Sequence, residues 1–268
     1  MTYDPFGIKN IRALLNDNGL YLSKNRGQNY LINRQSAEKI VNMLPALKED
    51  EKYLEVGTGL GALTVLLAEK GETVSLEIDK GVYNLVAKNM SHPNLTLLHN
   101  DFLKWDQYPK DQEYVFISNL PYSISGEAIK QFIENKAFKF GVLMLQAEFA
   151  ERMETSAGNS NYGPLSVIAQ HFLTIKKLFS VGKGNFFPEP KVDSLVISIE
   201  KKETCFNQKE FSIFIKTCFL AKRKTLANNL ANSPWANSII TKDPICSQRP
   251  DAISPEKWAE LFIQIKDL

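Results

Sequence analysis

A glycine-rich segment, LEVGTGLGALT at residues 54–64, is the feature that most constrains what this chain can fold into. Its first residues predict a short buried strand, glycines then alternate with other residues, and the apolar run that follows predicts a helix. Glycine lets a backbone turn tightly between two such elements and approach a ligand closely. The segment therefore predicts a strand–loop–helix unit of an α/β fold whose loop can meet a ligand.

The rest of residues 35–200 keeps this alternation of strand and helix. Runs of strand length, such as TVSLEID and YVFISN, are separated by helical patterns such as GVYNLVAKNM and GEAIKQFIEN. The alternation predicts βαβ units and therefore a mostly parallel central sheet in a Rossmann-like α/β fold. Two later runs, LTIKKLFSVG and SLVISIEKK, predict strands at an antiparallel edge of that sheet.

The pattern changes after residue 205, and residues 209–268 show no convincing strand. Ser254 and Pro255 suit the first positions of a helix, and apolar residues between Trp258 and Ile265 recur on one helical face. We therefore expect two domains, a ligand-binding catalytic domain at residues 1–205 and a small all-α domain at residues 206–268.

The composition is that of an ordinary globular protein. The chain has 268 residues, of which 44% are hydrophobic, and can bury a sizeable core without disulfides. Its cysteines lack a CxxC pair, which indicates core thiols in a reducing compartment, and its histidines do not join them at metal-ligand spacing. We see no apolar signal segment and no membrane span. We expect a cytoplasmic protein without a metal and, since no feature demands an oligomer, a monomer.

Positive charge gathers in two places although the formal net charge is only +2. Residues 1–34 contain an excess of basic side chains, namely Lys9, Arg12, Lys24, Arg26 and Arg34. A second cluster is Lys222, Arg223 and Lys224. Such clusters are often solvated surface, and they can also contact phosphates, so both interpretations stay open.

The spacing of the glycines indicates which class of nucleotide or nucleoside the loop can bind. Gly57, Gly59 and Gly61 follow a G-x-G-x-G pattern, whereas the dinucleotide fingerprint places its third glycine one residue later. The shorter spacing suits a nucleoside without a pyrophosphate, such as S-adenosylmethionine. Taken alone, the segment is interpreted equally well as a plain tight turn.

Two acidic residues follow at the ends of the next predicted strands. Glu77 lies at the end of TVSLE, where a carboxylate can accept both ribose hydroxyl protons. Asp101 ends LTLLHND, where a carboxylate can accept from an adenine amino group. Either acid alone is usually a helix N-cap or a solvated loop end. Their order after the glycine loop favours one ligand site beyond the carboxyl ends of the strands.

The fourth predicted strand ends in NLPYSIS at residues 119–125. The Asn119 side-chain oxygen and the Leu120 carbonyl can hold the two N–H groups of an exocyclic amine on a base. Pro121 biases Leu120 to extended geometry, and Tyr122 offers a ring on which the base can stack. This arrangement suits an in-line methyl transfer that relies on alignment. A proline-terminated strand with a turn asparagine is the structural alternative.

Taken together, these motifs resemble those of the KsgA-type small-subunit rRNA adenine dimethyltransferases, a branch of the class I S-adenosylmethionine-dependent methyltransferases. The resemblance runs from about residue 24 to residue 263. It is carried by LEVGTGLGALT and NLPYSIS, and also by RGQNYL (26–31), QAEFAERM, YGPLSV (162–167), FFPEPKVDS (186–194) and FLAKRKTLANNL (219–230).

The resemblance implies specific roles for residues of this chain. It implies S-adenosylmethionine contacts from Asn29, Leu31, Gly57, Gly59, Glu77, Asp101 and Asn119. It implies that the target amine meets Asn119, Leu120, Pro121 and Tyr122, and that Phe186 stacks on the extruded base. The chain departs from the family pattern at Thr58 (usually proline), Ser123 (usually asparagine), Ala147 (usually lysine) and Tyr30 (usually phenylalanine).

The resemblance also implies the substrate, which is small-subunit (16S) rRNA in the pre-30S particle. The implied reaction is dimethylation of N6 on two adjacent adenosines of the 3′-terminal hairpin loop, and a looped base is easier to extrude than a paired one. Three alternatives remain: a large-subunit rRNA adenine methyltransferase of the antibiotic-resistance type, a non-catalytic assembly factor for the small subunit, and a nicotinamide oxidoreductase, whose fingerprint spacing does not match.

Overall fold

A computed structural model describes residues 3–20, 28–109, 111–205, 207–236 and 243–266. The chain divides into two compact units, of which the first comprises Met1–Ala147 and Lys176–Glu200 and the second comprises Glu148–Ile175 and Lys201–Leu268. The second unit includes residues 148–175 because helix α7 (Pro164–Phe172) packs against α8 (Gln208–Cys218) and α10 (Pro255–Lys266). Functional domains divided at residue 205 stay a prediction, since compactness draws the boundary differently.

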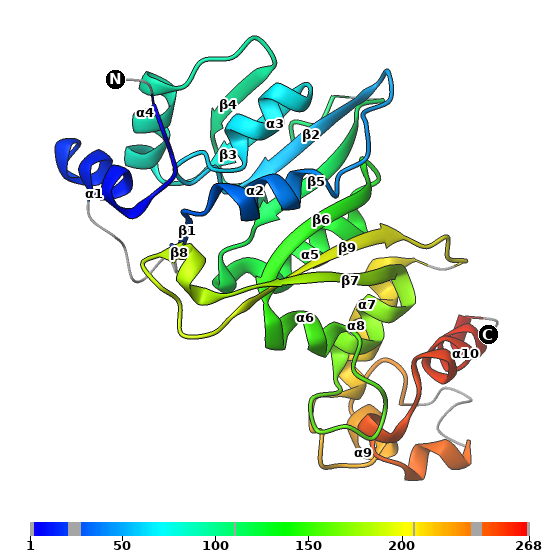
Figure 1. Cartoon of the computed structure of the whole chain (residues 1–268). Coiled ribbons are helices and arrows are strands. Elements are labelled where there is room, and N and C mark those ends of the chain that lie inside the picture. The colour runs from blue at the N-terminus through cyan, green and yellow to red at the C-terminus, as the bar shows by residue number, and fades with distance from the viewer. Residues whose placement is uncertain (1–2, 21–27, 110, 206, 237–242, 267–268) are drawn as a thin grey trace. The chain divides into compact units, whose positions relative to one another are not determined.

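A seven-stranded sheet in the order β4-β3-β2-β5-β6-β9-β7 provides the framework of the first unit (Figure 1). The pairs from β4 to β6 are parallel, and β9 pairs antiparallel with β6. The predicted mostly parallel α/β fold is therefore confirmed. The strands are β2 (Glu51–Val56), β3 (Thr73–Glu77), β4 (Leu95–His99), β5 (Glu113–Asn119), β6 (Phe138–Gln146), β7 (Leu173–Val181) and β9 (Ser194–Lys201).

Helices cover both faces of this sheet, with α2 in front of the strands and α5 behind them in Figure 1. Strand β5 has apolar side chains on both of its faces. On one face, Val115 and Ile117 belong to a buried cluster with residues of α2 and α3. Phe116, between them, points to the other face and meets Phe132 of α5. Alternate residues of a strand face opposite sides, so a strand that is apolar throughout needs cover on both. The helices of this unit are α1 (Ile8–Asp17), α2 (Arg34–Val41), α3 (Thr64–Lys70), α4 (Lys80–Asn89) and α5 (Ser125–Glu134).

The strand order reverses at β2, which lies between β3 and β5. The chain runs outward from β2 through β3 to β4, and then returns to place β5 and β6 on the opposite side. At such a switch point the connections leave in opposite directions, so a crevice opens beyond the carboxyl ends of the two central strands. The glycine loop follows β2 and NLPY begins with Asn119, the last residue of β5, so both segments border this crevice.

A buried hydrogen-bond network lies beneath the glycine loop. The Glu55 carboxyl oxygen Oε2 accepts hydrogen bonds from the hydroxyls of Thr64 and Ser75, each at 2.6 Å. The Ser75 hydroxyl also bonds that of Thr58, at 2.6 Å. Ser118 of β5 donates its hydroxyl to the Val56 carbonyl just before the loop. These contacts join β2, β3, α3 and the loop through polar groups that are all shielded from water.

The N-terminal segment covers the outside of the glycine loop. Ile11 and Leu15 of α1 are buried in a cluster with Leu60 of the loop and with Val82 and Leu85 of α4. The Tyr3 hydroxyl donates a hydrogen bond to the Leu60 carbonyl at 2.8 Å. Apolar burial thus holds this segment against the loop.

The second unit is helical apart from the strand residues at its borders, with α6 (Ala147–Met153) and α9 (Leu226–Leu230) beside α7, α8 and α10. Within it, the buried Asn229 side chain accepts a hydrogen bond from Ala221 N at 2.7 Å and donates one to Ala221 O at 3.2 Å. One amide thereby satisfies both backbone groups of a residue in the turn between α8 and α9. The predicted helical character of residues 209–268 holds for the part that the structure describes.

We expect Asn229→Ala to lower the free energy of unfolding by about 1–3 kcal/mol, because it leaves both backbone groups of Ala221 without this partner. Urea unfolding followed by tryptophan fluorescence measures the change. The matched control is Asn228→Ala, which removes an exposed neighbouring amide and should change stability by less than about 0.5 kcal/mol. Equal effects of the two variants would contradict the role given to Asn229.

We expect stability to depend on pH through Glu55, because burial raises the pKa of this carboxyl from 4.5 to about 8, with a smaller contribution from the neighbouring Glu77. The unfolded chain releases this proton at a lower pH than the folded chain does. The stabilisation from neutral Glu55 is therefore complete below pH 4.5 and is lost as pH rises through about 8.

Comparison with Glu55→Gln isolates this effect. Relative to the variant, the wild-type protein should lose up to about 1.4 kcal/mol of stability per pH unit between pH 5 and pH 8. Urea unfolding across that range measures it. Parallel pH profiles of the two proteins would show that Glu55 is not held neutral.

Candidate active site

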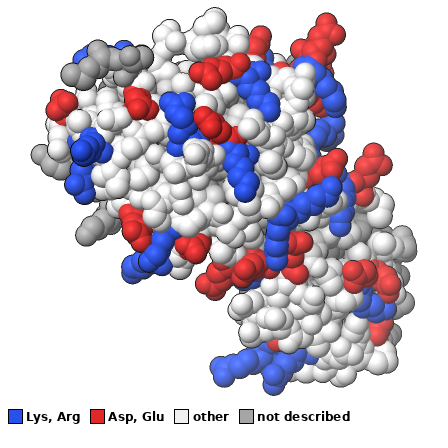
Figure 2. Space-filling model, viewed as in Figure 1, with Lys and Arg blue, Asp and Glu red and all other residues white. Residues whose placement is uncertain are grey.

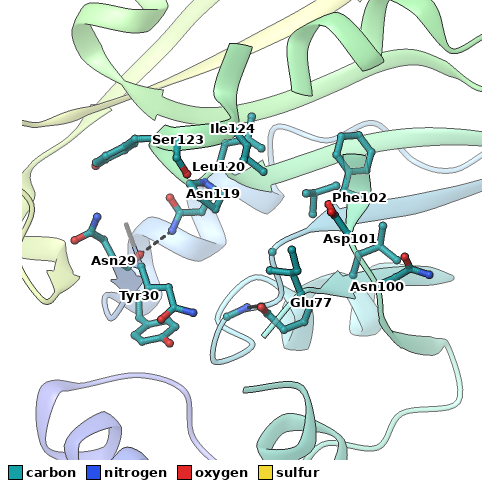
Figure 3. Close-up of a pocket in the computed structure, with 18 residues that line it drawn as sticks. Asn29, Tyr30, Glu77, Asn100, Asp101, Phe102, Asn119, Leu120, Ser123 and Ile124 are labelled. Atoms are coloured by element: carbon teal, nitrogen blue, oxygen red, sulfur yellow. Dashed lines mark hydrogen bonds between the residues drawn. The ribbon is translucent and has the colours of Figure 1, made fainter. Parts of the chain in front are cut away.

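A cavity of about 300 Å³ opens at the switch point of the sheet (Figure 3). Its volume is at the lower end of the range for small-molecule sites. Figure 3 shows Asn119 and Leu120 on one side of the cavity, Asn29 and Tyr30 below them, and Glu77, Asn100 and Asp101 opposite. The lining residues are Gln28, Asn29, Tyr30, Val56, Gly57, Gly59, Leu76, Glu77, Ile78, Asn100, Asp101, Phe102, Asn119, Leu120, Pro121, Tyr122, Ser123 and Ile124.

The glycine loop contributes a wall of bare backbone. Gly57 has φ +82° and Gly59 has φ +54°, a left-handed conformation that residues with a Cβ rarely adopt. A Cβ on Gly59 would also lie 3.2 Å from the Tyr30 ring. Both glycines line the cavity, and their predicted contact with a ligand stays a prediction.

Glu77 holds the loop to the neighbouring strand. Its Oε2 accepts a hydrogen bond from Gly59 N at 2.9 Å, and its Oε1 accepts one from Asp79 N at 2.8 Å. Burial raises the pKa of Glu77 above its usual range, and these backbone hydrogen bonds oppose that shift. Each carboxylate oxygen can accept a second bond, so the side chain can also receive hydroxyl groups from the cavity.

Asp101 caps a short helix and also lines the cavity. Its Oδ1 accepts a hydrogen bond from Leu103 N at 3.0 Å and so caps the short 3-10 helix Phe102–Lys104, which was the structural alternative considered from the sequence. Lys104 lies 3.6 Å from Oδ2, and this exposed lysine contributes little binding energy. The carboxylate nevertheless lines the cavity beside Asn100, so the capping role and a ligand contact are compatible.

Asn119 is oriented by a backbone carbonyl. Its Nδ2 donates a hydrogen bond to Asn29 O at 3.0 Å, which appears as a dashed line in Figure 3. Because the amide nitrogen is committed to this bond, the oxygen Oδ1 is the end that can accept a hydrogen bond from a ligand. The bond also connects two segments that are far apart in the sequence, GQN and NLPY.

The residues after Asn119 continue the same edge of the cavity. Leu120 is anchored by a hydrogen bond from its N to Met144 O at 3.2 Å, and Pro121 has φ −55° and ψ 130°. Tyr122 then begins the 3-10 helix Tyr122–Ile124 and is half-buried at the cavity wall. The structure thus brings together the sequence-predicted residues Asn29, Gly57, Gly59, Glu77, Asp101 and Asn119 to Tyr122.

Leu31 and Phe186 are the predicted site residues that do not line the cavity. They face each other in an antiparallel ribbon of β1 (Tyr30–Leu31) and β8 (Phe186–Phe187). Residues directly opposite in a ribbon share a face and their neighbours take the other. Tyr30 lines the cavity, so Leu31 and Phe186 face the hydrophobic core, each with 3% of its surface exposed. This placement does not support base stacking by Phe186.

Several lining residues were not predicted from the sequence. Ile78 has 57% of its surface exposed although it is large and apolar, and it follows Glu77 directly. Asn100 and Phe102 flank Asp101 in the same way. Nothing in hydrophobic periodicity distinguishes such residues from core or loop. Their proximity to a predicted strand-end carboxylate is the signal that could have identified them.

The basic residues of the two clusters lie in different environments. Lys222 Nζ donates hydrogen bonds to Ser160 O at 2.5 Å and Tyr162 O at 2.9 Å, so this lysine supports a neighbouring loop of its own unit. Arg223 and Lys224 are exposed, and Figure 2 shows blue side chains gathered at the lower end of this unit, by α9. Of the N-terminal group, Lys24 and Arg26 lie outside the described residues.

The described residues contain neither a candidate metal-binding group nor a helix suited to crossing a membrane. Among these residues, no group of three or more His, Cys, Asp or Glu side chains is arranged to hold a metal ion. No helix in the described part of the chain has the length and apolar character needed to cross a membrane.

Comparison with known proteins shows what this chain is similar to. The family model described as ribosomal RNA adenine dimethylase matches residues 21–245. The ribosomal RNA small subunit methyltransferase A of Mycoplasma mobile is 42% identical over 213 residues, which is 78% of this chain and 83% of that protein. The protein of the same name from Malacoplasma penetrans is 35% identical over 265 residues, or 96% of each chain.

Solved structures agree with the fold. A dimethyladenosine transferase from Plasmodium falciparum superposes with a TM-score of 0.75 at 28% identity, covering 88% of this chain and 97% of that one. The 23S rRNA methyltransferase ErmE superposes with a TM-score of 0.64 at 23% identity, covering 88% and 99%, and at this identity it shows the fold alone. By its sequence match over most of its length, the chain belongs to the ribosomal RNA adenine dimethylase family.

Proposed function

We propose that this protein is an S-adenosylmethionine-dependent rRNA adenine dimethyltransferase of the small ribosomal subunit. The proposed reaction adds two methyl groups to N6 of each of two adjacent adenosines in the 3′-terminal hairpin loop of the 16S rRNA, before the subunit is complete. The observation that carries the proposal is the convergence of the glycine loop, Glu77, Asp101 and Asn119–Tyr122 on one cavity.

The residues of one half of the cavity suit an adenosine-containing cofactor. Gly57 and Gly59 leave space that a Cβ would fill, and Glu77 and Asp101 offer carboxylate oxygens to a ribose and to an amino group. The apolar side chains of Ile78 and Phe102 provide walls for a flat ring. When bound, S-adenosylmethionine supplies a methyl group on a positively charged sulfur, which leaves as a neutral thioether.

The residues of the other half of the cavity suit an exocyclic amine on a planar base. With Nδ2 held by Asn29 O, the Asn119 Oδ1 accepts from one N–H of the target amine, and the Leu120 carbonyl accepts from the other. The Tyr122 ring supports the base. The hydrogen bonds to these two acceptors become stronger as the nitrogen forms its new bond to carbon and becomes positively charged. They therefore stabilise the transition state more than the ground state.

The transfer needs no strong base. The nitrogen lone pair forms the N–C bond, the S–C bond breaks with its electrons remaining on sulfur, and the cationic amine releases one proton to water. Asn119 and Leu120 contribute by alignment and by their partial negative charge. A second round at the same nitrogen requires that the monomethylated amine still present its remaining N–H to one of the two acceptors.

The exposed side chains of Arg223 and Lys224 suit contact with rRNA phosphates. Figure 2 shows positive and negative side chains interspersed over this face of the first unit, which agrees with the modest net charge of +2. Recognition would therefore depend on local patches and on the shape of the folded rRNA.

Transfer of labelled methyl groups to isolated ribosomal subunits tests the substrate. With unmethylated small and large subunits offered in parallel, we expect incorporation only into the small subunit, with the label mapping to N6 of the two adjacent adenosines. Incorporation only into the large subunit would favour the antibiotic-resistance type of enzyme. Binding to small subunits without any transfer would favour a non-catalytic assembly factor.

Asn119→Ala tests the assignment of the amine site. Loss of one positioned acceptor should lower the rate of transfer by about 10²–10³-fold or more, while binding to small subunits survives. The matched control is Asn94→Ala, which removes a part-buried asparagine before β4; this side chain bonds Ala68 O, and neither residue lines the cavity. Equal loss of binding and transfer in Asn119→Ala would contradict the assigned role.

A further inference from the structure

Thr58 belongs to the glycine loop, but it does not line the cavity. It lies between Gly57 and Gly59, which both line the cavity, yet its own side chain is 3% exposed and is not part of the lining. Its hydroxyl lies 2.6 Å from that of Ser75, a completely buried residue in the middle of β3. A polar side chain in such a position needs a reason, since burying a hydroxyl is favourable only when it is hydrogen-bonded.

The Thr58–Ser75 bond is one end of a chain of buried hydrogen bonds. The Ser75 hydroxyl also bonds Glu55 Oε2 at 2.6 Å. Either hydroxyl can be the donor in the Thr58–Ser75 bond. The chain of bonds runs from the loop, through β3, to a carboxyl of β2 that also receives the Thr64 hydroxyl at the start of α3. Such chains of hydrogen bonds strengthen one another in a buried setting.

The backbone alone holds the loop at few points. Gly57 N and Thr58 N both donate to the Leu76 carbonyl, at 2.8 Å and 3.1 Å, and Gly59 N donates to Glu77 at 2.9 Å. All of these contacts go to the end of β3. Within the loop, Gly61 N donates to the Thr58 carbonyl at 2.9 Å. The side-chain bond of Thr58 to Ser75 adds a contact one residue deeper in β3.

We infer that Thr58 and Ser75 are positioning residues for the methyl donor. Acting from beneath the loop, their hydrogen bond keeps the backbone of Gly57 and Gly59 in the conformation that receives the cofactor. Neither side chain touches the ligand. The inference rests on the proposed function, because it supposes that S-adenosylmethionine binds against this loop. Loss of the bond should weaken cofactor binding and leave the chemical step at saturating cofactor nearly unchanged.

The experiment compares Thr58→Val, which keeps the shape and removes the hydroxyl, with Thr58→Ser, which keeps the hydroxyl. We expect Thr58→Val to raise the dissociation constant for S-adenosylmethionine by about three- to tenfold, and Thr58→Ser to stay within about twofold of the wild type. Isothermal calorimetry gives the affinities, and methyl transfer at saturating cofactor gives kcat, which should change by less than about twofold.

Thr73→Val is the matched control for a general loss of stability. Thr73 is also buried in β3, but its hydroxyl bonds Gly71 O at the opposite end of the strand, away from the cavity. It should destabilise the protein without changing cofactor affinity. Ser75→Ala should weaken affinity as Thr58→Val does, and the double variant Thr58→Val/Ser75→Ala should be no weaker than Ser75→Ala alone, because both substitutions remove the same bond.

The affinities of these variants test the positioning role of the Thr58–Ser75 bond. An unchanged affinity in Thr58→Val, a loss in Thr58→Ser equal to that in Thr58→Val, or an equal loss in Thr73→Val would overturn the inference and leave the proposed function standing. Additive losses in the double variant would overturn the pairing of Thr58 with Ser75. Absence of S-adenosylmethionine binding by the wild-type protein would instead refute the proposed function, and this inference with it.

Discussion

Parallel pairing of β2 with both β3 and β5 is the constraint on which the rest of this structure depends. In parallel strands the carboxyl ends lie at the same edge, so the groups that follow β2, β3 and β5 are brought together. Parallel pairing therefore brings Gly57, Glu77 and Asn119 to one cavity. The bond from Gly59 N to Glu77 then closes the glycine loop onto the neighbouring strand.

In the proposed function, the two halves of the cavity have different requirements. The half proposed for the cofactor needs bare backbone and carboxylate oxygens, and the glycine loop beside it is held by buried hydroxyl groups that do not line the cavity. The half proposed for the target amine needs hydrogen-bond acceptors in fixed directions. Asn119 links the halves to the N-terminal segment, because its amide nitrogen bonds Asn29 O and its oxygen is thereby turned to the cavity. Asn29 lies outside any helix or strand, and its carbonyl nevertheless orients the Asn119 side chain.

Much of the site could be predicted because it follows strand ends, which hydrophobic patterns locate well. Leu31 and Phe186 were placed there by resemblance, and the register of a two-residue ribbon turns both of them into the core. Lys222 resembled a phosphate contact as much as a solvated residue, and it instead bonds backbone carbonyls of a nearby loop. Neither the face of so short a ribbon nor the target of a long flexible side chain is encoded in local sequence.

The sequence by itself determined the α/β alternation, the order of the motifs and the functional groups at the strand ends, because these depend on the period of apolar residues and on residue types at fixed spacing. Only the tertiary structure decided which side chains share a face, which way the Asn119 amide points and what holds the glycine loop from below. These properties arise from contacts between residues distant in the chain, such as Thr58 with Ser75 and Asn119 with Asn29, and no local pattern records them.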